Sequence, residues 1–383
     1  MRRPWRRRTR WRMSHKARIA YFAHSLRSDW NNGNAHFLRG LVRGLGEVGH
    51  EVVVYEPADN WSTVNLLAEA QGEESLAQFA STYADLTIRA YDAATSGKAS
   101  AWRARLAGVD IVIVHEWNPP ELAQALLRVR AECGFRLLFH DTHHRASSTP
   151  QQIRLFGIEQ FDGVLAFGET LRELYRQRFD IQRVWTLHEA ADISVFKPEP
   201  RTDKRNDVVW IGNWGDGERS AEIAEFFLKP AAALPNCRFA IHGVRYPEDG
   251  LAALNTAGVR YGGYLPNLSA PAVYAASRLT VHIPRQQYAT VMTGIPTIRV
   301  FEALACGIPL ISAPWSDCES LFRNGDFLTV RNSGEMRRAI EYLLSEPEAA
   351  AAKAAQGRET ILARHTSKHR AQQLSTLIQE ELS

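Results

Sequence analysis

The sequence predicts an α/β protein made of two Rossmann-like, doubly wound domains that face each other across a cleft. Its 383 residues exceed one typical core and suit two domains of roughly 150 to 200 residues each. Short apolar runs alternate with helical patterns in both halves, which is typical of parallel sheets covered by helices. A composition of 45% hydrophobic and 23% charged residues excludes disorder for the bulk of the chain.

The first half opens with a strand, a helix and a strand, at residues 18–24, 35–48 and 51–55. Residues 63–107 have a helical pattern. The remaining elements predicted here are strands at 109–115, 136–140, 163–166 and near 184–187, with a helix at 121–132. These elements form the predicted N-terminal domain, residues 14–195.

A stretch with two prolines and no apolar periodicity then indicates a linker at residues 196–206. The βα alternation restarts in the predicted C-terminal domain, residues 207–365. Its strands are expected at 207–211, 238–242, 279–283 and 308–312, and its helices from about Ser220, at 270–276 and at 297–305. Residues 366–383 form a last helix, which either crosses back onto the N-terminal domain or stays free for a partner or a membrane surface.

The charge of the chain is concentrated at its start. Residues 1–12 hold seven arginines and no acid, so a net charge of +4 leaves −3 on the remainder. A nucleic-acid partner for the whole protein is therefore not expected. Residues 1–13 are expected to be a disordered basic arm, either a tether to anionic lipid or nucleic acid or an extension without a role before Met13.

Two further absences limit the class of protein. No apolar run approaches the roughly 18 residues of a membrane span, although peripheral membrane contact stays open. The four cysteines lie far apart, in no metal or disulfide spacing, which favours a reducing, cytoplasmic location.

Polar residues follow the predicted strands, where α/β sheets bind ligands. The loop after the first strand contains His24, Asn32, Gly33 and Asn34, and it suits either an oxygen-rich ligand or an ordinary turn with a helix cap. It lacks the dinucleotide fingerprint, so a nicotinamide cofactor is not expected.

Two neighbouring strand ends carry titratable groups, with Glu116 after one and Asp141, His143 and His144 after the other. Their spacing lacks the helical pair of zinc proteases, so no metal site is expected. They either line a polar cleft, where they bind hydroxyl groups or hold a proton, or have a structural role.

The second half offers two sites for an anion. The glycine-rich turn at 210–220 brings Gly212, Asn213 and Arg219 to a helix start, but it lacks the lysine of a P-loop. Further on, Pro296 starts a helix whose first amides would face the cleft, beyond Arg285. At about 100° per residue, Arg299 and Glu302 share one helix face, so both are expected to point at the ligand, unless they form a simple surface ion pair.

These segments resemble the GT-B glycosyltransferases, most closely a CgeB-like, spore-maturation branch related to families 1 and 4. The resemblance covers roughly residues 17–345, and the segments that carry it are 139–145, 189–198, 210–220, 242–247 and 296–312, the last ending Phe-Glu-Ala-Leu-Ala-Cys-Gly-Ile-Pro-Leu-Ile-Ser. It implies a nucleotide-sugar donor in the C-terminal domain and an acceptor on the N-terminal domain.

The resemblance also implies roles for individual residues. Glu302 would hold the ribose hydroxyls, and the amides of Thr297 and Ile298 with Arg299 would bind the diphosphate. Residues 262–265, including Tyr264, would contact the base, while His143 or His144 would lie near the transferred sugar. The full expectation is a catalytic group of Asp141, His143 and His144, a donor site of Gly212, Asn213, Arg219, Tyr264, Arg285, Thr297, Ile298, Arg299 and Glu302, and an acceptor side of His24, Asn32, Gly33, Asn34 and Glu116.

The expected reaction is sugar transfer without a metal or cofactor and with retention of configuration, to an unidentified glycan, lipid or small molecule. One departure from family 4 is Gly294, which stands eight positions before Glu302 where that family has a second acid. The alternatives are a non-catalytic binding protein of the same fold and a sugar-nucleotide epimerase.

Overall fold

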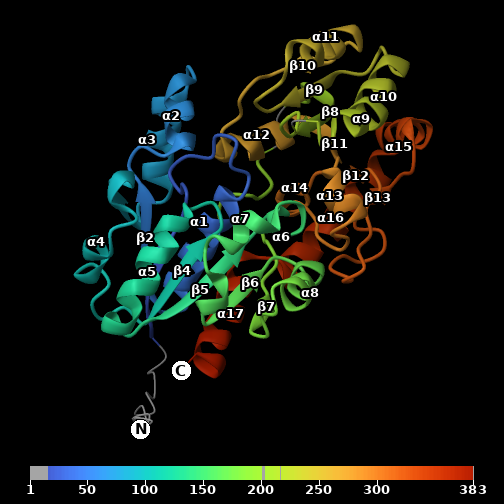
Figure 1. Cartoon of the computed structure of the whole chain (residues 1–383). Coiled ribbons are helices and arrows are strands. Elements are labelled where there is room, and N and C mark those ends of the chain that lie inside the picture. The colour runs from blue at the N-terminus through green and yellow to red at the C-terminus, as the bar shows by residue number, and fades with distance from the viewer. Residues whose placement is uncertain (1–15, 201–202, 216, 383) are drawn as a thin grey trace, which may run out of the picture.

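The computed structural model describes residues 16–200, 203–215 and 217–382. The chain forms two lobes, each built on a wholly parallel sheet covered by helices (Figure 1). The predicted basic arm lies outside the described residues. The α/β class with two Rossmann-like domains is confirmed.

The first sheet has the strand order β3-β2-β1-β4-β5-β6-β7. Its strands are β1 (Arg18–Phe22), β2 (Glu51–Pro57), β3 (Thr87–Tyr91), β4 (Ile111–His115), β5 (Arg136–Asp141), β6 (Gly163–Ala166) and β7 (Val184–Thr186). Its helices are α1 (Ala35–Glu47), α2 (Trp61–Ala68), α3 (Gly72–Thr82), α4 (Ala99–Arg103), α5 (Pro120–Cys133), α6 (Arg145–Ser148), α7 (Pro150–Arg154) and α8 (Glu169–Arg178), with 3₁₀ turns at Ala93–Thr95 and Ile158–Gln160.

The second sheet has the order β10-β9-β8-β11-β12-β13. Its strands are β8 (Asn206–Ile211), β9 (Phe239–His242), β10 (Arg260–Tyr261), β11 (Ser277–His282), β12 (Leu310–Ser312) and β13 (Leu328–Thr329). The helices are α9 (Ser220–Ile223), α10 (Lys229–Ala233), α11 (Glu248–Thr256), α12 (Ala270–Ala275), α13 (Gln286–Thr290), α14 (Ile298–Cys306), α15 (Ser333–Ser345), α16 (Pro347–Arg364) and α17 (Ser367–Glu381). A π-helical turn at Ala224–Leu228 and a 3₁₀ turn at Asn267–Ser269 complete the set.

The central strands form because their apolar, mostly β-branched residues are buried on both faces of the sheet. All five residues of β4 are buried, as are all six of β8. Registers such as Ile19 opposite Ile111 and Val208 opposite Leu279 place the carboxyl ends of these strands at one edge of each sheet.

The helical pattern predicted over residues 63–107 was wrong in part, because it contains β3. This strand lies at the edge of its sheet, and its residues are mostly exposed. An exposed edge strand needs no buried apolar run, so the sequence shows neither the period of a buried strand nor a clear turn.

Helix α17 lies against α1 of the first domain, although the chain reaches it from the second (Figure 1). Two glycines of α1 make the approach possible, because a Cβ at Gly44 would lie 2.9 Å from the Cβ of Ala371 and one at Gly40 still closer to Ser367. Farther along, Nε2 of His50 lies 2.8 Å from Oγ of Ser375. The last helix therefore joins the two domains.

Candidate active site

A cavity of about 570 Å³ lies between the two domains. In each sheet the strand order reverses between two neighbouring strands, β1 and β4 in the first and β8 and β11 in the second. Ligands of open α/β sheets bind at such reversal points, beyond the carboxyl ends of the strands. The segments that follow these strands line the cavity, among them residues 31–34 after β1 and 211–213 at the end of β8.

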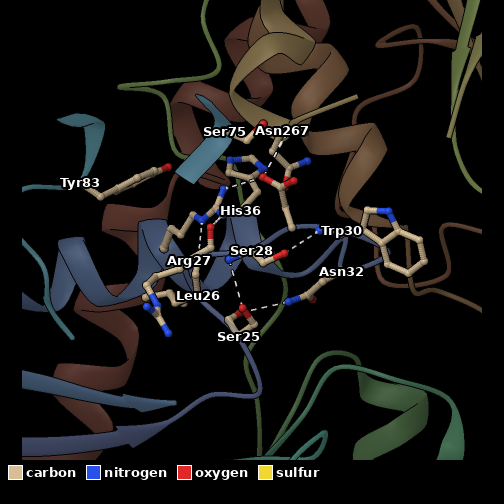
Figure 2. Close-up of polar contacts among 12 residues, drawn as sticks. Ser25, Leu26, Arg27, Ser28, Trp30, Asn32, His36, Ser75, Tyr83 and Asn267 are labelled. Atoms are coloured by element: carbon tan, nitrogen blue, oxygen red, sulfur yellow. Dashed lines mark hydrogen bonds and ion pairs between the residues drawn. The ribbon is translucent and has the colours of Figure 1, made fainter. Parts of the chain in front are cut away.

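The loop after β1 is held by its own hydrogen bonds (Figure 2). The amide of Asn32 donates to the carbonyl of Ser25 at 3.0 Å, and the backbone N–H of Ser28 donates to Oγ of Ser25 at 3.1 Å. Asn34 is oriented by Thr142, whose Oγ1 accepts from its Nδ2 at 2.6 Å. The loop thus has a fixed shape in which the predicted residues His24, Asn32, Gly33 and Asn34 line the cavity.

Contacts across the cavity connect this loop with the second domain. Asp29 accepts a hydrogen bond from the hydroxyl of Tyr264 and another from the backbone N–H of Asn267 at 3.2 Å, while Arg39 donates to it at 3.0 Å. Asn213 donates to the side-chain oxygen of Asn31. These contacts hold the two walls close together at one end of the cavity.

The glycine-rich turn after β8 lies close to the backbone that follows β9. A Cβ at Gly243 would lie 2.1 Å from the carbonyl oxygen of Gly212, so only glycine fits at this position. Gly215 has φ +90°, and a Cβ there would lie 2.8 Å from Cγ of Arg219. The turn therefore packs tightly around Arg219, whose guanidinium lies over the ring of Trp210.

Arg219 is a buried cation that forms no ion pair with a carboxylate within the described ranges, although Glu218 lies near enough to act on it electrostatically. Its Nε has no hydrogen-bond partner among the described residues, and it lines the cavity together with Arg285. Burial, followed by the positive charge of Arg285, lowers the pKa of Arg219 to about 9. An anion placed between them would relieve both effects.

Arg285 is already paired with Glu218, at 2.5 Å. Nε2 of His144 lies 3.4 Å from the other oxygen of the same carboxylate. The contact with His144, and then the ion pair with Arg285, lower the pKa of Glu218 to about 2. His144 is thereby turned away from the cavity wall and does not line it.

The N-terminus of α14 faces the cavity through Thr297, Ile298 and Arg299. The N-cap residue Thr297, which precedes the helix, makes no side-chain cap, so the first amides of this nine-residue helix lack that partner. The positive end of the helix dipole and these amides suit an anion.

The structure does not place Glu302 where the sequence predicts it, at the ligand. Its carboxylate is buried with no exposed surface and does not line the cavity. One oxygen lies 2.9 Å from Nδ1 of His36, on α1 of the other domain, and the second oxygen pairs with Arg299. Direct contact with ribose hydroxyls is therefore not available to Glu302 in this structure.

The protonation of His36 follows from its contacts. Its Nε2 accepts the backbone N–H of Asp192 at 2.9 Å, so the proton is on Nδ1 and is donated to Glu302. Although burial alone would raise the pKa of Glu302, Arg299 and His36 hold it below the ordinary value. Glu302 is thus a positioning residue that joins the domains and holds Arg299 at the cavity.

His143 reaches the cavity on the other wall, beside Trp117, whose ring centroid lies 4.9 Å away. Its backbone N–H donates to Asp141 at 3.0 Å, and its Nδ1 is buried without a hydrogen-bond partner among the described residues. Burial and the neighbouring His144 lower its pKa well below the ordinary value, so the ring is neutral.

Asp141 and Glu116 lie behind this wall instead of on it. Asp141 is fully buried and accepts the hydroxyl of Tyr175 at 2.5 Å, while Glu116 is fully buried and paired with Arg145. Burial raises the pKa of both carboxyl groups. Asp141 therefore fixes the backbone of His143, and Glu116 does not reach an acceptor in this arrangement.

The cavity gathers most of the predicted residues and leaves out four. Those that line it are His24, Asn32, Gly33, Asn34, His143, Gly212, Asn213, Arg219, Tyr264, Arg285, Thr297, Ile298 and Arg299. Asp141, His144, Glu116 and Glu302 do not. The roles assigned to all of these residues stay predictions.

Several cavity residues were missed by the sequence analysis. They are Asp29, Asn31, Trp61, Trp117, Glu189, His282 and Tyr288. The rule that ligands bind beyond strand ends could have found His282, the last residue of β11. The same rule could have pointed to Glu189, which follows β7 and begins the interdomain segment 189–198.

Within the described ranges, no group of three or more His, Cys, Asp or Glu side chains could hold a metal ion. None of the helices described is long and apolar enough to cross a membrane.

Comparison with known proteins defines the class. A family model described as "Glycosyl transferase-like" matches residues 219–376, most of the second domain. No curated protein matches the sequence.

Solved structures match over nearly the whole chain. The Anabaena protein HepE in complex with UDP and glucose has a TM-score of 0.68 at 13% identity, covering 95% of this chain and 100% of its own. A glycosyltransferase from Rickettsia africae gives 0.65 at 12% identity, covering 96% and 99%. Sucrose-phosphate synthase from Thermosynechococcus elongatus gives 0.65 at 15% identity, covering 94% and 98%.

At these identities the solved structures show the fold, which is GT-B. The family model adds that the second domain is glycosyl transferase-like. The predicted GT-B fold is therefore confirmed, and the family model agrees with the predicted glycosyltransferase class over residues 219–376.

Proposed function

We propose that the protein transfers a sugar from a nucleoside diphosphate sugar, bound by the second domain, to a hydroxyl group of an acceptor bound by the first. One observation carries the proposal. Arg219 and Arg285 converge on the cavity where the first amides of α14 also face it, and Nε of Arg219 has no hydrogen-bond partner among the described residues. Cations and helix amides arranged in this way suit a diphosphate.

The same groups suit the chemistry of the leaving group. As the bond between sugar and phosphate breaks, the sugar becomes oxocarbenium-like and negative charge grows on the diphosphate. Fixed donors stabilise that charge, typically by about 3 to 4 kcal/mol for a well-placed one. Arg299 would contribute in the orientation that Glu302 holds.

The finer expectations are part of the proposal. The HepE structures contain UDP or UDP-glucose, which makes UDP-sugars the first donors to test. The CgeB-like branch, the retaining outcome, the absence of a metal and the cytoplasmic location stay predictions. The acceptor stays an unidentified glycan, lipid or small molecule, and peripheral membrane contact stays open.

Calorimetry with UDP and a panel of nucleotide sugars tests the proposal. We expect binding without added metal, followed by slow release of free sugar when no acceptor is present. Chromatography of the products separates the alternatives, because an epimerase would return an altered nucleotide sugar. A binding protein without catalysis would return the donor unchanged, and no binding of any nucleotide sugar would contradict the proposal.

A further inference from the structure

Glu189 is a buried acid that the chemistry described so far does not use. It lies in the segment between β7 and β8 that connects the two domains, and it lines the cavity. Its side chain is 3% exposed, and its Oε1 has no hydrogen-bond partner within the part of the chain that the structure describes. A buried polar atom without a partner costs free energy, so its presence in a cavity points to a ligand.

The backbone on both sides of Glu189 is firmly held. The N–H of Leu187 donates to the carbonyl of Ala166 at 2.7 Å, and the N–H of Ala191 donates to the carbonyl of His365 at 3.0 Å. Nε of Arg370, on α17, donates to the carbonyl of His188 at 2.9 Å. Hydrogen bonds from β6 and α17 therefore set the direction of this side chain, and its contact with the cavity does not depend on a loose loop.

The roles predicted for its neighbours would put Glu189 near the sugar end of a bound donor. It interacts electrostatically with Arg299, at the start of α14, and with Tyr288 of α13. Tyr288 packs against His144, with ring centroids 5.7 Å apart, and so belongs to the side of the cavity where His143 lies. Tyr264 and Val244, which suit the base, belong to the glycine-rich loops of the second domain instead.

We propose that the Glu189 carboxyl group hydrogen-bonds hydroxyl groups of the transferred sugar. This inference rests on the proposed function and adds a determinant of sugar recognition to it. Burial, together with the nearby carboxylate of Glu302, raises the pKa of Glu189 well above its ordinary value, so the group is protonated when the cavity is empty. A protonated carboxyl group has both a donor and an acceptor to offer, as a sugar hydroxyl does.

The surroundings of Gly294 support the same proposal. The position eight before Glu302 carries no acid, and a Cβ there would lie 2.6 Å from Sγ of Cys318 and 3.0 Å from a carboxylate oxygen of Glu319. That site is filled by other side chains and does not line the cavity. Glu189 supplies a carboxyl group to the cavity from the connecting segment instead.

The test compares affinities for UDP and UDP-glucose by calorimetry in the full chain. For Glu189→Ala we expect UDP affinity within about twofold of the wild type and UDP-glucose affinity about tenfold lower, the usual effect of losing one buried hydrogen bond. Glu189→Gln keeps a donor and an acceptor and should recover most of the loss. Glu319→Gln is the matched control, since it alters a buried carboxyl group at the same domain interface but outside the cavity.

The outcomes separate the two proposals. Equal weakening of UDP and UDP-glucose in Glu189→Ala, or the same discrimination between them as in the wild type, would overturn the sugar-binding role. A lower melting temperature with unchanged discrimination would assign Glu189 a structural role and overturn it too. If the wild type binds UDP-sugars and sugars linked to other nucleotides equally poorly, the proposed function itself fails and this inference falls with it.

Discussion

The two walls of the cavity handle charge in opposite ways. The wall of the second domain presents Arg219, Arg285 and Arg299 to the cavity, and Nε of Arg219 has no hydrogen-bond partner in the part of the chain that the structure describes. The wall of the first domain keeps the carboxylates Glu116 and Asp141 behind the surface, pairs its cavity-lining Asp29 with Arg39, and presents neutral groups such as His143. The comparison teaches that one wall is built for an anion and the other for an uncharged, hydroxyl-bearing molecule.

The largest effect is expected when Arg219, the cation of the second-domain wall, is removed. Arg219→Ala takes away a charge-assisted contact to phosphate, which is worth about 2 to 3 kcal/mol, or roughly 30- to 150-fold in affinity for UDP. Calorimetry measures this directly. Arg337→Ala, on the far exposed face of α15, should leave the affinity unchanged, and a loss below threefold in Arg219→Ala would contradict the anion site.

Acidic pH should lower the free energy of unfolding of both domains, because each contains a buried histidine with a lowered pKa. Burial lowers the pKa of His140 in the first sheet and of His282 in the second to about 3. Between pH 6.5 and 3 the unfolded chain binds protons that the folded chain refuses, so stability is constant above this range and falls within it. Each histidine contributes up to about 1.4 kcal/mol per pH unit, or about 2 kcal/mol between pH 6.5 and 5.

Urea unfolding at pH 7.5 and pH 5 measures the acid effect. His140→Gln should be less stable than the wild type at pH 7.5 but should lose less on acidification. If the variant and the wild type lose the same stability between the two pH values, the pKa of His140 is not lowered in the folded protein, which would contradict the prediction.

Replacing His143, a neutral residue on the first-domain wall, should leave the anion site of the second domain intact. For His143→Ala we expect UDP affinity within about twofold of the wild type, with donor turnover about tenfold lower, the effect of one lost hydrogen bond. Steady-state kinetics and calorimetry on the same preparation separate the two. If His143→Ala also lost UDP affinity to a similar extent, the first-domain wall would contribute to anion binding, and the comparison of the two walls would be wrong.

The smallest effect is expected for Tyr264→Phe, which removes the hydroxyl that crosses the cavity to Asp29. Arg39 and the backbone of Asn267 remain as partners of this carboxylate, so the loss of stability should be about 0.5 to 1 kcal/mol. Thermal unfolding measures it. A much larger loss would show that the contact between the walls depends on this one hydroxyl.

The sequence predicted the buried elements well and the edges poorly. β4 and β8 contain the apolar runs 111–114 and 208–211 because both of their faces are covered, and the sequence shows these runs directly. β10 and β13 were missed together with β3, because edge strands of two to five half-exposed residues carry no such run. A hydrophobic pattern in the sequence indicates burial, and the residues of these three strands are little buried.

The candidate site shows a different limit. Strand ends predicted most of the cavity, since parallel topology brings them together whatever the side chains are. Helical periodicity placed Arg299 and Glu302 on one face correctly but could not tell that His36, from a helix 266 positions earlier, packs against half of that face. Glu189 begins the segment 189–198 that carries the family resemblance, but an isolated acid has no periodicity that would show it to be buried in the cavity.

The position of α17 bears on how the protein is made. Ribosomes release the chain from its first residue to its last, so the groove along Gly40 and Gly44 of α1 stays open to water until the second domain has been synthesised. A prematurely terminated product would display this small-residue groove as an unfinished surface. The first domain contains all of its own strands, but the covering of its first helix is completed by the last segment of the chain to be made.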